Sequence, residues 1–371
     1  MKVGRYNYAH QLGDDVETLM AELRAMLVGG RYELTAEVKQ FEQQLAHFLG
    51  ARFVRGVNTG TDALVVALRA LGVGRGDEVI TQANTFHATV GAIDLVGATP
   101  VLVDVDPETF LIDRALLRDA IGPRTRVLMP VHLYGKPTPM AEIVALAEER
   151  GLFVVEDAAQ AIGARIEGQC VSTFGHFGCF SFHPSKNLAA CGDGGAVVAR
   201  NADLDEAVRR QRELGQCGQN NHVVVGLNTK LDAVQARILS SKLPRLAEWN
   251  ERRRQAAARY REMLGGLPLT FQAQTPGETH AYHLFQIRTK QRDALVAWLR
   301  DREIDAVIRY PTPIHLQPAF ASYGWREGQY PVAEALAREL CCLPIRPDIS
   351  EAEIDYVAGC VRSFFDRAAE V

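Results

Sequence analysis

One lysine and one aspartate stand out as groups that could do chemistry together. Lys186 lies in the segment FSFHPSKNL, and Asp157 lies in the earlier segment VEDAAQA. A lysine amine can form a Schiff base with an aldehyde, and a carboxylate can hold a protonated pyridine nitrogen. Ser181 and the run from Gly192 to Gly195 add a hydroxyl and flexible backbone near the lysine. Together these groups meet the requirements of pyridoxal phosphate.

A second segment has the features of a phosphate cradle. Gly60 and Thr61 lie in NTGTDAL, directly after an apolar run, where small and hydroxyl residues open the next helix. The first N–H groups of a helix have no internal partner and can bind phosphate. Ordinary structural explanations stay open, because Thr and Asp also cap helices that bind nothing. Likewise, Asp157 could cap the segment after it and Lys186 could be solvated.

The elements around these residues predict an α/β fold. Between residues 50 and 215, short Val-rich runs bounded by Gly, Asp or Pro alternate with amphipathic stretches. This alternation is typical of a largely parallel sheet covered by helices. We expect helices at 61–71 and 139–149. The expected strands are 53–57, 78–80, 99–103, 127–132, 152–155, 179–182 and 196–199.

The chain then changes character. Residues 231–264 form one long helical pattern, interrupted at Pro244. A smaller α/β unit follows it, with expected strands at 282–288 and 306–309 and helices at 292–302, 332–340 and 351–366. We therefore predict a large cofactor-binding domain, 1–245, and a small C-terminal domain, 246–371.

Composition and motifs exclude several other classes. The 371 residues carry 41 basic and 45 acidic side chains, a net charge of −4, which argues against attachment to nucleic acid or an anionic membrane. No secretory leader or long apolar run is visible, so we expect a cytoplasmic protein. The seven cysteines form no C-x-x-C pair, and no metal site is expected. The glycine cluster 72–76 follows a helical pattern and precedes a strand, the reverse of the order in a dinucleotide fingerprint.

The combined motifs resemble the DegT/DnrJ/EryC1/StrS family. The strings that carry the resemblance are NTGTDAL, GDEVITQANTF, VEDAAQAIGA, FSFHPSKNLAACGDGGAVV, GLNTKLDAVQA and PIHLQPAF. The resemblance spans roughly residues 25 to 365. It implies a sugar aminotransferase that uses pyridoxal 5'-phosphate (PLP), with the three-layer fold of aspartate aminotransferase. It also implies a homodimer whose active sites are shared between subunits.

The resemblance assigns roles to individual residues. It makes Lys186 the Schiff-base lysine and Asp157 the partner of the pyridine nitrogen. Tyr310 and His315 lie in segments that border the sugar site in relatives. The other implied cofactor contacts are Gly60, Thr61 and Ser181 at the phosphate, Phe86 stacked on the ring, Gln160 near the phenolic oxygen, and Asn228 from the partner subunit.

The resemblance also indicates the reaction and the class of substrate. It implies transfer of an amino group from glutamate or glutamine to a keto group of a nucleotide-linked sugar. Gln160 and the run from Gly192 to Gly195 resemble the branch that aminates 3-keto-6-deoxy sugars. A 4-keto sugar and an aminocyclitol ketone are the alternatives. A sugar dehydratase is disfavoured because Lys186 is present, and a non-catalytic regulator has no need of the full residue set.

Two segments depart from the family pattern. Arg309 precedes Tyr310 where relatives usually have histidine, and residues 33–36 replace a glycine-containing run. Both segments face the substrate in relatives.

Overall fold

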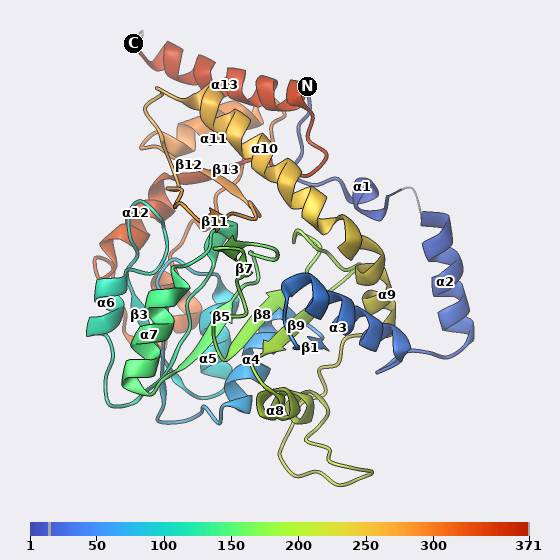
Figure 1. Ribbon diagram of the computed structural model, residues 1–371. Coiled ribbons are helices and arrows are strands. Elements are labelled where there is room, and N and C mark those ends of the chain that lie inside the picture. Colours follow the sequence, from blue (N-terminus) through green and yellow to red (C-terminus); the bar gives the residue numbers. More distant parts are fainter. Residues whose placement is uncertain (14–15, 370–371) are drawn as a thin grey trace.

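A seven-stranded sheet forms the centre of the chain in the computed structural model, which describes residues 1–13 and 16–369 (Figure 1). The strand order is β1-β9-β8-β5-β4-β2-β3, and β9 alone runs antiparallel to its neighbours. The strands are β1 (Phe53–Val57), β2 (Glu78–Gln82), β3 (Thr99–Val103), β4 (Thr125–Leu128), β5 (Phe153–Asp157), β8 (Phe177–Ser181) and β9 (Gly195–Ala199).

Helices cover both faces of this sheet because successive strand side chains point to opposite sides. On β8, Phe177 and Cys179 pack with one layer of helices, whereas Phe180 packs with the other. The first layer contains α4 (Gly60–Ala70), α5 (His87–Leu95) and α8 (Ala202–Arg212). The second contains α3 (Ala36–Leu49), α6 (Arg114–Asp119), α7 (Met140–Arg150) and α9 (Ala233–Lys242). The expected three-layer α/β arrangement is present.

A smaller unit packs its own hydrophobic core beyond the sheet. Its antiparallel sheet has the order β10-β12-β13. Val3 belongs to the same core and bridges Ile304, so the N-terminal segment lies with α13 (Figure 1). The division into 1–245 and 246–371 stays a prediction. The elements of this unit are α10 (Leu246–Leu264), β10 (Thr270–Phe271), β12 (Phe285–Arg288), α11 (Arg292–Arg300), β13 (Leu340–Leu343) and α13 (Glu351–Ala369).

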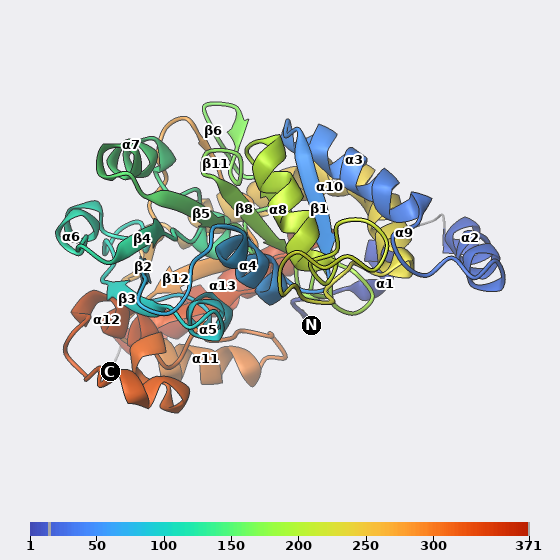
Figure 2. The ribbon, with the colours of Figure 1, turned by 90° about the horizontal axis from the view of Figure 1, so that it is seen from below.

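The remaining elements are short or peripheral. Helix α2 stands at the edge of the molecule in both views (Figures 1 and 2). No described helix is long and apolar enough to cross a membrane. These elements are α1 (Tyr8–Leu12), α2 (Val16–Val28), β6 (Arg165–Ile166), β7 (Gln169–Cys170), β11 (Glu278–Thr279) and α12 (Pro331–Glu339), with 3₁₀ turns at 133–135, 243–245, 314–316 and 318–323.

Most expected elements are observed within a few residues of their predicted bounds. The predicted interruption of the long helix is confirmed, because α9 ends at Lys242 and α10 begins at Leu246. The expected strand at 306–309 is wrong: only Val307 pairs, in a single bridge to Cys342. Val307 lies at the outer edge of β13, and β13 pairs on its other side with β12 along its whole length. Strand β13 directly follows a helical pattern and is only four apolar residues long, so the periodicity of the sequence could not predict it.

Candidate active site

The predicted residues meet at one edge of the large sheet. Strands β1, β2, β5 and β8 run in the same direction, so their C-terminal ends lie together, which is where ligands of open α/β sheets bind. A cavity of about 530 Å³ lies there. Eight of the ten predicted site residues line it: Gly60, Thr61, Phe86, Asp157, Gln160, Ser181, Lys186 and Tyr310.

Strand alternation separates two neighbouring acids at the end of β5. Asp157 faces α5, where Oδ2 accepts a hydrogen bond from Thr89 Oγ1 at 2.8 Å and Oδ1 accepts one from the Ala159 N–H at 3.1 Å. Glu156 faces the opposite layer and is fully buried. It accepts bonds from three backbone N–H groups, including that of Ser172 at 2.7 Å. Glu156 therefore holds a loop in place, and Asp157 remains available to the cavity.

The charges of Asp157 and Lys186 are tuned by burial and by each other. Burial raises the pKa of the Asp157 carboxyl, and the bonds from Thr89 and Ala159 and the charge of Lys186 oppose that rise. Loss of solvent lowers the pKa of the Lys186 amine to about 8, although the Asp157 charge raises it; the Arg309 charge lowers it further. The amine is therefore neutral in a substantial fraction of molecules near pH 8.

The segment after β1 forms a close backbone cradle at the start of α4. Thr59 caps the helix, and its Oγ1 accepts a hydrogen bond from the Asp62 N–H at 2.9 Å. A Cβ atom on Gly60 would lie 2.5 Å from Cβ of Ser181, so only glycine fits this approach. The N–H groups of Gly60 and Thr61 lie in the first helical turn, where no internal partner exists. The residues present thus suit a bound phosphate.

The opposite side of the cavity is built from both parts of the chain. Gln160 accepts a hydrogen bond from the Tyr134 N–H at 2.7 Å, and its Nε2 donates to Oη of Tyr310 at 3.0 Å. The rings of Phe86 and Tyr310 lie 5.4 Å apart between centroids. Phe86 is 49% exposed, unusual for a large apolar side chain whose only task is core packing.

Two predicted residues lie outside this cavity. His315 is buried, and its Nε2 contacts Oε1 of Glu334 at 3.0 Å while its ring packs against Tyr330. Asn228 is exposed and pairs with Glu213 at the base of the segment between α8 and α9. That segment projects away from the body of the molecule (Figure 1).

Three further residues bear on the chemistry of the cavity although they were not among the predicted site residues. Thr89 supports Asp157, and Arg309 and His283 line the wall. Burial, together with the charges of Lys186 and nearby arginines, lowers the pKa of His283 well below its usual value. His283 is therefore neutral. The departure from relatives at Arg309 was a visible signal, whereas nothing in the local sequence pointed to His283 or Thr89.

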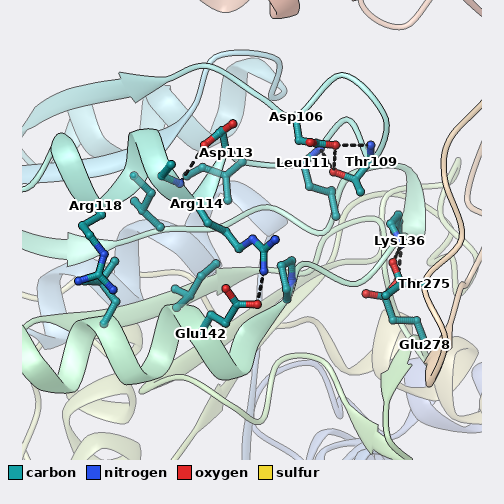
Figure 3. Close-up of a pocket in the computed structure, with 16 residues that line it drawn as sticks. Asp106, Thr109, Leu111, Asp113, Arg114, Arg118, Lys136, Glu142, Thr275 and Glu278 are labelled. Carbon is teal, nitrogen blue, oxygen red and sulfur yellow. Dashed lines mark hydrogen bonds and ion pairs between the residues drawn. The ribbon is translucent and has the colours of Figure 1, made fainter.

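A second cavity, of about 620 Å³, lies between α6, α7 and β11. Figure 3 shows its charged side chains facing one another: Arg114 pairs with Glu142, and Lys136 pairs with Glu278. Asp106 accepts its hydrogen bonds from Thr109 and Glu108. Because these groups satisfy each other, this cavity offers less to a ligand than the one at the strand ends. No cluster of described His, Cys, Asp and Glu residues is suited to a metal ion.

Comparison with known proteins identifies relatives of this chain. Residues 14–362 match the model of the DegT/DnrJ/EryC1/StrS aminotransferase family. A UDP-N-acetyl-3-dehydro-alpha-D-glucosamine 3-aminotransferase of Acidithiobacillus ferrooxidans is 43% identical over 346 residues, which cover 93% of each chain.

Solved structures agree with this result. DesV of S. venezuelae, crystallised in complex with a ketimine intermediate, aligns with a TM-score of 0.96, 40% identity and 99% coverage of both chains. The expected fold is thereby confirmed. The PLP form of Spr1654, a putative sugar aminotransferase from Streptococcus pneumoniae, aligns with a TM-score of 0.89 and 26% identity over 95% of this chain and 96% of its own.

Proposed function

The chain belongs to the DegT/DnrJ/EryC1/StrS aminotransferase family, and from that premise we propose that it is a PLP-dependent aminotransferase of keto nucleotide sugars. The observation that carries the proposal is the meeting of Lys186 and Asp157 in one cavity. Lys186 is the only lysine among the described residues that line it. Covalent attachment of an aldehyde cofactor requires an amine there, so it falls to Lys186. The same amine can also move a proton at the substrate.

Different residues of the cavity are suited to different parts of PLP. Gly60, Thr61 and Ser181 would hold the phosphate, Phe86 would stack on the ring, and Gln160 would lie near the phenolic oxygen. Asp157 would stabilise the positive charge of a protonated pyridine nitrogen. When bound, PLP supplies an electron sink for breaking bonds at the amino-bearing carbon. Thr89 favours the ionised form of Asp157 by donating to its carboxylate, and Lys186, with its pKa near 8, can give and accept a proton at neutral pH.

We propose a 3-keto-6-deoxy sugar as the acceptor and glutamate or glutamine as the donor. The Acidithiobacillus relative is named for amination at carbon 3, and Gln160 borders the cavity where the acceptor must approach. A small rotation of the sugar would bring a different carbon to the cofactor, and a displacement of about 1 Å can cost about 100-fold in rate. The wall around Gln160 and Tyr310 therefore decides which carbon is aminated.

A substrate comparison tests this proposal. Holoenzyme would be assayed with L-glutamate and with nucleotide-linked 3-keto-6-deoxy and 4-keto-6-deoxy hexoses. We expect faster amination of the 3-keto sugar. Preference for the 4-keto isomer, or activity only on a cyclitol ketone, would contradict the acceptor and leave the aminotransferase in place. A holoenzyme that exchanges no amino group with any donor would contradict the aminotransferase itself.

We also propose a homodimer with shared sites, in which Asn228 of each chain reaches the phosphate of the other. Exposed Asn228 lies at the base of a projecting segment whose Val223, Val224 and Val225 are 49%, 40% and 83% exposed. Such an apolar cluster favours burial against another chain. Mixing an Asn228→Ala variant with a Lys186→Ala variant tests the proposal. If sites are shared, one site of each mixed dimer lacks both residues and the other is intact, so activity returns. Continued inactivity of a mixture shown to contain mixed dimers would contradict sharing.

A further inference from the structure

The guanidinium of Arg309 is a cation without a counter-ion in the cavity wall. Arg309 is half-buried and lines the cavity beside Lys186. No described residue forms an ion pair or a side-chain hydrogen bond with its guanidinium, although ion pairs hold many of the other arginines. Its N–H donors, free of protein partners among the described residues and facing the cavity wall, are suited to an anion that enters the cavity.

The backbone around Arg309 is held on both sides. Oη of Tyr134 donates to the Arg309 carbonyl oxygen at 2.8 Å. The next residue, Tyr310, is tied to Gln160 at 3.0 Å. Both partners belong to segments that line the cavity, so the backbone at Arg309 is fixed relative to them. This anchoring lowers the entropy lost when the guanidinium binds a ligand.

The other charged groups of the cavity do not neutralise Arg309. Asp157 already accepts bonds from Thr89 and Ala159. Asp193 is exposed and makes no described ion pair. The charge of Arg309 does reach Lys186, because it contributes to the lowered pKa of that amine. An anion bound at Arg309 would therefore lie close to the group that exchanges the amino nitrogen.

We propose that Arg309 binds a carboxylate of the amino-acid donor; a sugar with a carboxylate at carbon 6 is the alternative source, and it would replace the 6-deoxy acceptor proposed above. The planar guanidinium offers two parallel N–H donors that match the two oxygens of a carboxylate. An α-carboxylate is joined to the carbon that carries the donor nitrogen, which must itself reach the position of Lys186. This inference rests on the proposed function, and it adds the residue that selects carboxylated reactants.

Binding gives a test that needs no turnover. Glutarate has the two carboxylates of glutamate but no amine. Glutaramide, its uncharged analogue, is the control ligand for binding that does not depend on a carboxylate. Calorimetry on the holoenzyme should show glutarate binding weakened roughly 10- to 100-fold in Arg309→Met. Arg309→Lys should recover part of this loss, because it retains the charge. The matched control Arg75→Met removes an exposed arginine outside the cavity and should bind like the parent.

Half-reactions then identify the source of the carboxylate. If the donor is the source, Arg309→Met should slow the half-reaction with L-glutamate by roughly 10- to 100-fold. The half-reaction with 4-aminobutyrate, which lacks the α-carboxylate, should change by less than about 3-fold. If the sugar is the source, Arg309→Met should slow amination only of a keto sugar with a carboxylate at carbon 6, and amination of its 6-deoxy analogue should not change.

Two results would overturn the inference. One is unchanged glutarate binding together with unchanged half-reactions in Arg309→Met. The other is an equal loss for carboxylated and uncarboxylated reactants, which would show a general disturbance of the cavity. A parent enzyme that binds glutarate through Arg309 but exchanges no amino group would instead contradict the proposed function alone.

Discussion

Gln160 and Tyr310 join the large sheet to the C-terminal part of the chain through a hydrogen bond of 3.0 Å from Nε2 to Oη. Gln160 follows β5, whereas Tyr310 lies 150 residues further along. Burial raises the pKa of Tyr310 well above its ordinary value, so the phenol is protonated at neutral pH. Tyr310 thus links the two parts of the chain and also forms part of the cavity wall.

Removing this hydroxyl should weaken the link and leave the aromatic wall. We expect Tyr310→Phe to lower the free energy of unfolding by about 1 kcal/mol, the typical contribution of one hydrogen bond. Its ring can still pack against Phe86. Urea denaturation measures the difference, with Tyr32→Phe as a control, because that hydroxyl bonds Leu27 on an exposed surface. A Tyr310→Phe variant as stable as the parent would show that the link contributes nothing.

The reactivity of Lys186 should depend on pH in a defined direction. Only the neutral amine attacks an aldehyde, and the pKa of Lys186 is lowered from 10.5 to about 8. We expect the rate of covalent PLP capture by cofactor-free protein to rise with pH and reach half its maximum near pH 8. In Asp157→Asn the midpoint should fall, because the lost negative charge favoured the protonated amine. Stopped-flow absorbance measures the rate, and a midpoint near pH 10.5 would contradict the tuning.

Thr89 should act through the charge of Asp157. Its hydrogen bond stabilises the ionised carboxylate, so Thr89→Val should raise the pKa of Asp157 further. More of the carboxyl is then protonated at a given pH. We expect the acidic limb of the kcat/KM profile to move to higher pH by about one unit, the effect of about 1.4 kcal/mol. Thr89→Ser keeps the hydroxyl and should keep the parent profile; the same displacement in both variants would contradict this role.

The cradle should tolerate no side chain at Gly60. A new Cβ would meet Cβ of Ser181 at 2.5 Å, so the backbone must move. We expect Gly60→Ala to weaken PLP binding at least 10-fold, because the phosphate-binding N–H groups are displaced. Equilibrium dialysis measures the affinity. Gly359→Ala is the matched control, since nothing lies within 4 Å of its added Cβ in α13. Unchanged affinity in Gly60→Ala would place the phosphate elsewhere.

Local sequence patterns were sufficient for most of the large sheet, and they singled out Lys186 and Asp157 as candidates whose roles the family resemblance then assigned. The runs 53–57 and 99–103 form strands with the predicted bounds, because short Val-rich segments between breakers have few other ways to bury their side chains. Lys186 could be singled out because the chain has only seven lysines, and Asp157 because it closely follows a short apolar run. Both identifications depend on the residue type and on the strand that precedes the residue, and the local sequence encodes both of these.

Only the tertiary structure decided which other residues share the cavity. Arg309 and His283 reach it from the far part of the chain, and Thr89 reaches Asp157 from a neighbouring helix. His315, by contrast, is buried against Glu334. These placements follow from the packing of distant segments, in which a rotation of one helix or a shift of one residue in strand register changes the neighbours of a side chain. A single sequence records the side chains, and long-range packing determines which of them meet.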